Sequence, residues 1–135
     1  MVKRGSSIGF FGIFGRSEDM RRLDEALRDA GLHPAQVPEG VKLAAVGLMT
    51  SEETPEPPPA AYPSVGELMA FCALGGELFA HENGEARLAA ATRRMETALE
   101  AGEGRDAETV LLMLHAKLIH PALVDRYAIR AESED

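Results

Sequence analysis

Residues 68–76, with the sequence LMAFCALGG, form a stretch that contains no polar side chain. Ser64 and Glu67 stand just before it at the spacing of a capping box, in which each side chain satisfies the other's backbone N–H, so we expect a helix to begin there. A helix that is apolar on every side has to be surrounded by other elements. The stretch therefore predicts a central, buried helix with the rest of the chain packed around it.

Residues 110–119 are also apolar on nearly every side, and Asp106 is suited to cap the helix that contains them. Pro121 lacks a backbone N–H and disfavours helical geometry at His120, so this helix should end or kink there and a short turn should follow. No useful length of sequence alternates between apolar and polar residues. The chain is thus predicted to be all-α, a single compact, orthogonal or bundle-like domain of about five helices with two apolar central helices.

Two helices are expected before the central one. Ser17 stands ahead of two acidic residues and predicts the start of an amphipathic helix, which Gly31 ends in a Schellman motif. Residues 41–49 fit a short helix packed against the first, and a strand is the alternative interpretation.

Residues 85–101 follow an Asn-Gly turn and predict an Ala-rich helix. Its inward stripe is expected at Leu88, Met95 and Leu99, and its arginines, Arg87, Arg93 and Arg94, are expected to face water. The Gly75-Gly76 pair, in the middle of the preceding helix, costs about 1 kcal/mol for each glycine relative to alanine. Such a cost is usually offset by a close approach of backbone, so we expect a helix crossing or a kink at that pair.

Residues 50–63 connect the two halves of the chain, with four prolines between residues 55 and 59 and with acidic but no basic side chains. This composition predicts an exposed polyproline spacer within one domain; the alternative, a ligand for a partner's groove, rests on the spacing of Pro55 and Pro58 alone. The expected organisation is an apolar Gly- and Phe-rich segment at 1–16, a single helical domain at 17–130 and an acidic tail at 131–135. Within the helical domain, residues 17–49 hold a helix and a short helix, residues 50–63 form the connection, and residues 64–130 hold three main helices.

Acidic side chains outnumber basic ones by 22 to 14, which gives a formal net charge of -8. This charge repels nucleic-acid phosphate and anionic lipid, so it excludes non-specific nucleic-acid binding and disfavours contact with a membrane. No apolar run approaches the roughly 20 residues of a transmembrane helix. Because Cys72 is the single cysteine, no internal disulfide is expected, and we predict a cytoplasmic protein. The excess of Arg over Lys suggests a bacterium with a GC-rich genome.

Glu77, His81 and His115 are the candidate ligand- or metal-binding residues, because they are polar groups within apolar helices. Glu77 and His81 are four residues apart and share a helix face, and apolar neighbours three and four residues away direct His115 inward, where it would meet Glu77 if the two central helices pack together. The alternative is a core histidine with Glu77 and His81 at an exposed end. No catalytic residue, cofactor or metal-binding motif is predicted.

The N-terminal segment holds the candidate interaction surface, Phe10, Phe11, Ile13 and Phe14. These side chains either fold back as a lid on the core or dock on a second chain or, less favourably, on a membrane interface. We therefore expect a non-enzymatic α-helical adaptor or regulatory module that acts through protein contacts with a partner or with further copies of itself. The alternative is a small-ligand or metal-binding helical protein that uses Glu77, His81 and His115.

Overall fold

The computed structural model describes residues 6–129, and for residues 6–17 it describes the backbone alone. Throughout this part of the chain the regular structure is helical, which confirms the predicted all-α fold. The elements are α1 (Ser6–Asp29), the 3₁₀ helix η1 (Pro34–Gln36), α2 (Glu39–Leu48), α3 (Ala61–Asn83), α4 (Glu85–Ala101), α5 (Arg105–His115) and α6 (Pro121–Tyr127). The expected acidic tail, 131–135, lies outside the described residues.

Helix α1 starts earlier than its cap signal predicted. It begins at Ser6, so Ser17 lies within the helix and does not cap it. The predicted boundary was wrong because a Ser side chain caps a helix only where the preceding backbone is non-helical. Residues 6–16 contain no proline that would enforce such a break, and here the helix simply continues through them.

The C-terminal end of α1 has the predicted Schellman motif. Gly31 has a φ of +93°, the Leu32 N–H donates to the Leu27 carbonyl over 2.9 Å, and the Gly31 N–H donates to the Arg28 carbonyl over 2.9 Å. The buried side of the helix consists of Leu23, Ala26 and Leu27, and Ala30 directly after its end is buried as well.

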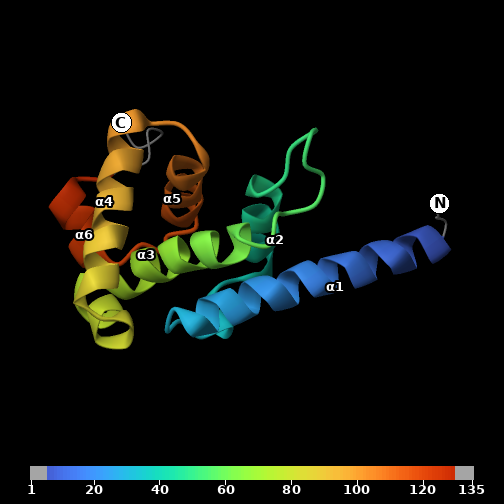
Figure 1. Ribbon diagram of the computed structural model, residues 1–135, viewed down its shortest axis with the longest axis horizontal. Coiled ribbons are helices and arrows are strands. Elements are labelled where there is room, and N and C mark those ends of the chain that lie inside the picture. Colours follow the sequence, from blue (N-terminus) through green and yellow to red (C-terminus); the bar gives the residue numbers. More distant parts are fainter. Residues whose placement is uncertain (1–5, 130–135) are drawn as a thin grey trace.

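Helix α3 is the central helix that its apolar sequence predicted. Residues 68–72 are all buried, and α1, α4, α5 and α6 each pack against α3 (Figure 1). The crossing with α1 lies at Gly66, where an added Cβ would stand 2.7 Å from the Cβ of Ala26. Glycine therefore lets the two helices approach closely at this position.

The predicted capping box at the start of α3 does not form. The helix begins at Ala61, one turn before its expected start, so Ser64 is already helical. The Ser64 Oγ accepts a hydrogen bond from the Arg94 guanidinium over 3.1 Å, and the Glu67 carboxylate pairs with Arg87. Both side chains that were expected to cap α3 therefore bind arginines of α4 instead.

The predicted irregularity at the glycine pair is a kink. Gly75 has a φ of +80° and a ψ of 169°, which interrupts the helical geometry of α3. A Cβ at Gly75 would stand 2.9 Å from the Cγ of His120, and the His120 N–H donates to the Cys72 carbonyl over 2.8 Å. The segment that leads into α6 therefore fits against the kink.

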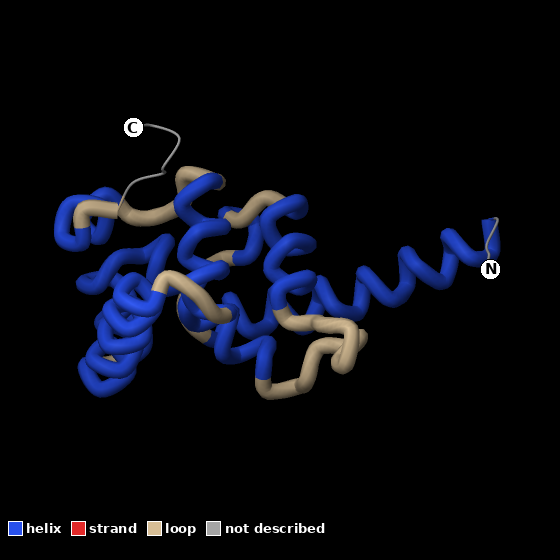
Figure 2. The backbone as a smooth tube through the Cα atoms, turned by 90° about the horizontal axis from the view of Figure 1, so that it is seen from above, coloured by secondary structure: helices blue, strands red, loops and turns tan. Residues whose placement is uncertain are grey.

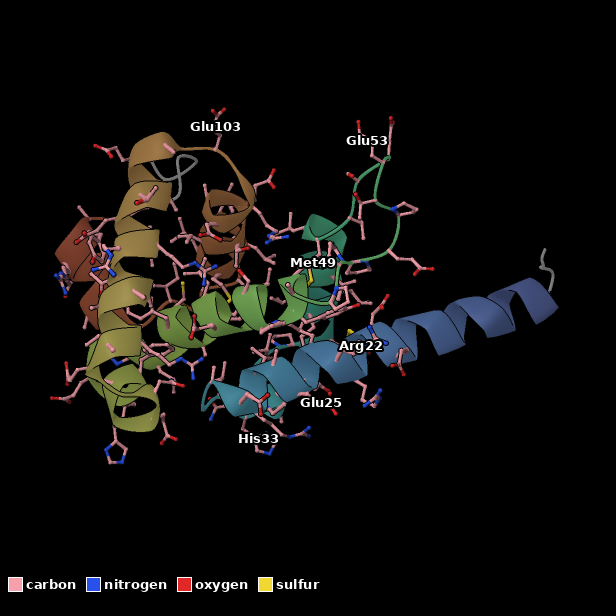
Figure 3. All side chains as sticks on the ribbon, in the orientation of Figure 1. Arg22, Glu25, His33, Met49, Glu53 and Glu103 are labelled. Atoms are coloured by element: carbon pink, nitrogen blue, oxygen red, sulfur yellow. The ribbon has the colours of Figure 1, made fainter. Side chains whose placement is uncertain are left out.

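Helix α2 confirms the short helix predicted before the Pro-rich connection, and the strand alternative was wrong. Lys42 joins α2 to α1 through an ion pair of 2.9 Å between its Nζ and the Asp24 Oδ1. The predicted connection, 50–63, forms a largely exposed loop as far as residue 60, but residues 61–63 already belong to α3, where Ala61 and Tyr62 are buried. Figure 3 shows Glu53 at the outer end of this loop.

Helix α4 has its predicted bounds, but two of its side chains lie differently from expectation. Leu99 is 39% exposed and does not belong to the buried stripe, which Ala91, Met95 and Ala98 form. Arg94 is half-buried rather than solvated, because it reaches across to Asp106.

Helix α5 begins and ends earlier than predicted. Its N-cap position is Gly104, so Asp106 sits inside the first turn, and the helix ends at His115 before Lys117, which has a φ of +61°. Pro121 then starts α6, and the Nδ1 of His120 accepts the Ala122 N–H over 3.0 Å as an N-cap. Pro121 thus begins a helix, as predicted.

The arrangement of the helices separates two ends of the molecule. Figure 1 shows α4 and α5 side by side across α3, and both figures show the N-terminal half of α1 projecting from the other end (Figures 1 and 2). Within residues 6–129, no helix combines the length and the apolar character that crossing a membrane requires.

Candidate functional site

The three predicted ligand residues do not form a site in this structure. Glu77, His81 and His115 are all exposed, so the predicted inward direction of His115 was wrong. His115 is exposed because Thr109, Val110 and Met113 form the buried face of α5, and position 115 lies nearly opposite Met113 around the helix. Among the described residues, no group of three or more His, Cys, Asp and Glu side chains is arranged to hold a metal ion.

The predicted interaction residues Phe10, Phe11, Ile13 and Phe14 lie on the helical backbone of α1, but their side chains fall outside the described part of the structure. Their interpretation as a docking surface stays a prediction. The backbone places them on the projecting half of α1 (Figure 1).

Arg94 is the centre of a polar cluster that joins α3, α4 and α5. Its guanidinium donates to both carboxylate oxygens of Asp106, with Nε–Oδ2 at 3.0 Å and Nη2–Oδ1 at 2.8 Å. The Nη2 also donates to the carbonyl and the Oγ of Ser64, each over 3.1 Å. The hydrogen bond with Asp106 raises the pKa of Arg94, so the guanidinium stays charged. These contacts satisfy the cluster internally and give it a structural role.

Tyr62 lies between two shallow polar hollows at the junction of α1, the Pro-rich loop and α3, with volumes of about 300 and 320 Å³. Its hydroxyl donates to the Asp19 Oδ1 over 2.7 Å, and burial together with this bond raises the pKa of Tyr62 to about 12. Arg21 and Arg22 line the hollows, but Arg21 pairs with Glu18 and Glu25, and Arg22 pairs with Glu18. The hollows therefore offer an anion only guanidinium groups that are already neutralised.

Cys72 is unsuited to nucleophilic chemistry. It is buried in α3, and burial raises the pKa of its thiol to about 12. The reactive thiolate is therefore suppressed at neutral pH, and the side chain packs as an apolar group.

A third hollow, which we call the α4–α5 groove, has apolar residues along its whole lining. Its volume is about 200 Å³, and its walls come from the end of α4, the residue that follows α4, α5, and Ile129 shortly after α6. The lining residues are Ala98, Leu99, Gly102, Ala107, Val110, Leu111, Leu114 and Ile129.

Two leucines border the groove on opposite helices and remain accessible to water. Leu99 on α4 is 39% exposed, and Leu111 on α5 is 51% exposed. Large apolar side chains that face water beside an apolar hollow are typical of protein interaction sites. A side chain of a partner that enters the groove would remove both leucines from water.

Most of the exposed charged residues that neighbour the groove lining in the sequence are acidic, and Arg105 at the start of α5 is the basic exception. Glu100 and Glu103 follow Leu99 closely at the end of α4, Glu108 is next to Ala107, and all three carboxylates are exposed. Figure 3 shows Glu103 at the connection between α4 and α5, directed away from the body. Opposite charge in a partner would strengthen an apolar contact here.

The sequence had identified neither the groove nor its edge. Leu99 was expected inside the core and Leu111 lies in a stretch that appeared apolar on all sides. The sequence did contain one indication of exposed leucines, because the stretch is apolar around the whole helix. A helix at the edge of a small domain has neighbours on only part of its circumference, so some of these side chains must face water. Which leucines stay exposed depends on the helix arrangement.

Comparisons with family models, with curated proteins and with solved structures find no significant match for this chain.

Proposed function

We propose that this protein is a helical interaction module that receives an apolar helix of a protein partner in the α4–α5 groove. The supporting observation is the groove lined by apolar residues, together with its two leucines that are 39% and 51% exposed. Covering Leu99 and Leu111 would contribute about 1 kcal/mol each, because roughly half of each side chain is left to bury. We place this activity in the cytoplasm as part of the same proposal.

The chemistry of the groove selects the kind of helix that binds. A volume of about 200 Å³ has room for one or two large apolar side chains, which an amphipathic helix presents at positions three and four residues apart. The exposed carboxylates of Glu100, Glu103 and Glu108 favour lysine or arginine beside those side chains. The expected ligand is therefore a basic amphipathic helix.

A designed peptide tests this proposal. A fluorescent 14-residue helix of Ala and Lys, with Leu at positions 3, 6, 7 and 10, is titrated with the protein and followed by anisotropy. A second peptide has Glu at each Lys position. We expect the Lys peptide to bind more tightly than the Glu peptide, and Leu111→Glu to weaken its binding by about tenfold or more.

Leu78→Glu is the matched control, because Leu78 is 50% exposed but does not line the groove. It introduces the same charge at a similar exposure, so it should leave peptide binding unchanged. Circular dichroism checks that both variants keep their helical content. Equal binding to the wild type and to both variants, or no binding by the wild type, would contradict the proposal.

A further inference from the structure

We propose that the occupant of the α4–α5 groove is the N-terminal part of α1 from a second copy of this chain, so that copies associate head to tail. This inference rests on the proposed function of the groove and names its partner. The argument combines the position of α1, the residue pattern of its N-terminal part and the charges of the two surfaces.

The position of α1 prevents the segment from reaching the groove of its own chain. Ser6–Asp29 is one continuous helix, and a helix of 24 residues is about 36 Å long. Its N-terminal half projects from the end of the molecule opposite α4 (Figures 1 and 2). As long as α1 stays unbroken, this half is held away from the groove of the same copy and is presented to another copy.

The residue pattern of the projecting half is that of a groove-binding helix. At about 100° per residue, positions 10, 11 and 14 share one face of the helical backbone, and all three are phenylalanine. Positions 9, 12 and 15 share the opposite face, and all three are glycine. The segment thus has one aromatic stripe, at the spacing by which helices anchor in apolar grooves.

The charges of the two surfaces are complementary. The first acidic residue of the chain is Glu18, and Lys3, Arg4 and Arg16 precede it on either side of the phenylalanines. This basic, apolar stretch contrasts with the chain as a whole, whose net charge is -8. Glu100, Glu103 and Glu108 stand beside the groove, so the segment matches the basic amphipathic helix that the groove favours.

The sequence after Ile129 is a poorer candidate for the groove. Residues 130–135 contain three carboxylates, one arginine and no large apolar side chain. They have the same sign of charge as the groove surroundings and nothing that would fill an apolar hollow. The N-terminal part of α1 has both properties that the groove requires.

A head-to-tail contact uses two different surfaces, and this property allows a complementation test. One variant carries Leu111→Glu, which alters the groove and leaves the N-terminal helix intact. The other carries Phe11→Ser and Phe14→Ser, which alter the helix and leave the groove intact. Serine and phenylalanine have similar helix propensities, so the backbone of α1 should be retained.

Sedimentation velocity measures self-association of each variant alone and of an equimolar mixture. We expect the wild type and Leu78→Glu to self-associate, each variant alone to lose association by about tenfold or more, and the mixture to form a one-to-one heterodimer. Leu99→Glu serves as a second groove variant if Leu111→Glu does not fold by circular dichroism. Restoration in the mixture requires an intact helix on one copy and an intact groove on the other.

Three outcomes would overturn the inference. A groove variant that still associates would mean that the phenylalanine surfaces pair with each other. Two monomeric variants whose mixture stays monomeric would show that the helix and the groove are not partners. A wild type that stays monomeric while the designed Lys peptide binds its groove would reject self-association and leave the proposed function standing.

Discussion

Gly75 is the residue on which the path of α3 depends. Its φ of +80° and ψ of 169° belong to a region that only glycine adopts without strain, and His120 occupies the space where a Cβ would stand. The kink lets the segment before α6 donate the His120 N–H to the Cys72 carbonyl. A sequence with two adjacent glycines predicts such a feature, but the structure shows which glycine bends the helix.

Gly75→Ala should lower the free energy of unfolding by about 2 to 4 kcal/mol. The alanine would strain the backbone at a φ of +80°, and its Cβ would lie only 2.9 Å from the Cγ of His120. Urea denaturation followed by circular dichroism measures the change. Gly47→Ala is the control, since Gly47 is helical and has nothing within 4 Å of an added Cβ. It should stabilise the protein by about 0.5 to 1 kcal/mol. A loss of less than about 0.5 kcal/mol at Gly75 would contradict the kink.

Cys72 should make stability fall at alkaline pH. Burial raises the pKa of its thiol from 9.0 to about 12, so the folded state retains a proton that the unfolded chain releases. The stabilising contribution is therefore complete below pH 9 and is lost as the pH rises toward 12. Urea midpoints at pH 8 and pH 10.5 should differ less for Cys72→Ala than for the wild type. Identical differences in the two proteins would show that the thiol titrates normally in the fold.

For the helices, the apolar sequence patterns were better predictors of position and burial than the candidate capping residues were. The polar-free stretch identified α3 as the central helix, and the bounds of α4 agree with expectation. Ser64, Glu67 and Asp106 all resembled caps, yet each binds an arginine of α4 instead. A sequence shows which side chains can cap a helix, but the packing decides whether a stronger, charged partner takes them.

Arg94 should hold α3, α4 and α5 together more strongly than a lysine would. Arg94→Lys loses the two-pronged contact with Asp106 and the bonds to Ser64, which we expect to cost about 1 to 3 kcal/mol in urea denaturation. Arg93→Ala on the exposed side of the same helix should change stability by less than about 0.5 kcal/mol. Equal effects of the two substitutions would mean that the cluster contributes no more than a solvated surface.

At the scale of the whole molecule, the two surfaces assigned to binding lie at opposite ends. Helices α4 and α5, whose residues line the groove, lie toward one end of the molecule, and the N-terminal half of α1 projects at the other (Figure 1). The sequence marked the phenylalanine segment as either a lid on the core or an interaction surface, and the interaction surface stays a prediction. It did not predict the groove, because exposure of Leu99 and Leu111 follows from where the chain places α4 and α5. Composition could nominate the phenylalanine segment as a candidate surface, whereas the groove becomes visible only in the fold.

If the N-terminal helix of one copy lies in the groove of another, as proposed, paramagnetic relaxation detects their proximity. A nitroxide is attached at Ser7→Cys in a Cys72→Ala background, which leaves the introduced thiol as the only one. This protein is mixed with an isotope-labelled copy that carries no spin label. We predict that the methyl signals of Leu99 and Leu111 in the labelled copy broaden while that of Leu78 keeps its intensity. Broadening at Leu78 and not at the groove, or no broadening at concentrations where copies associate, would contradict the proposal.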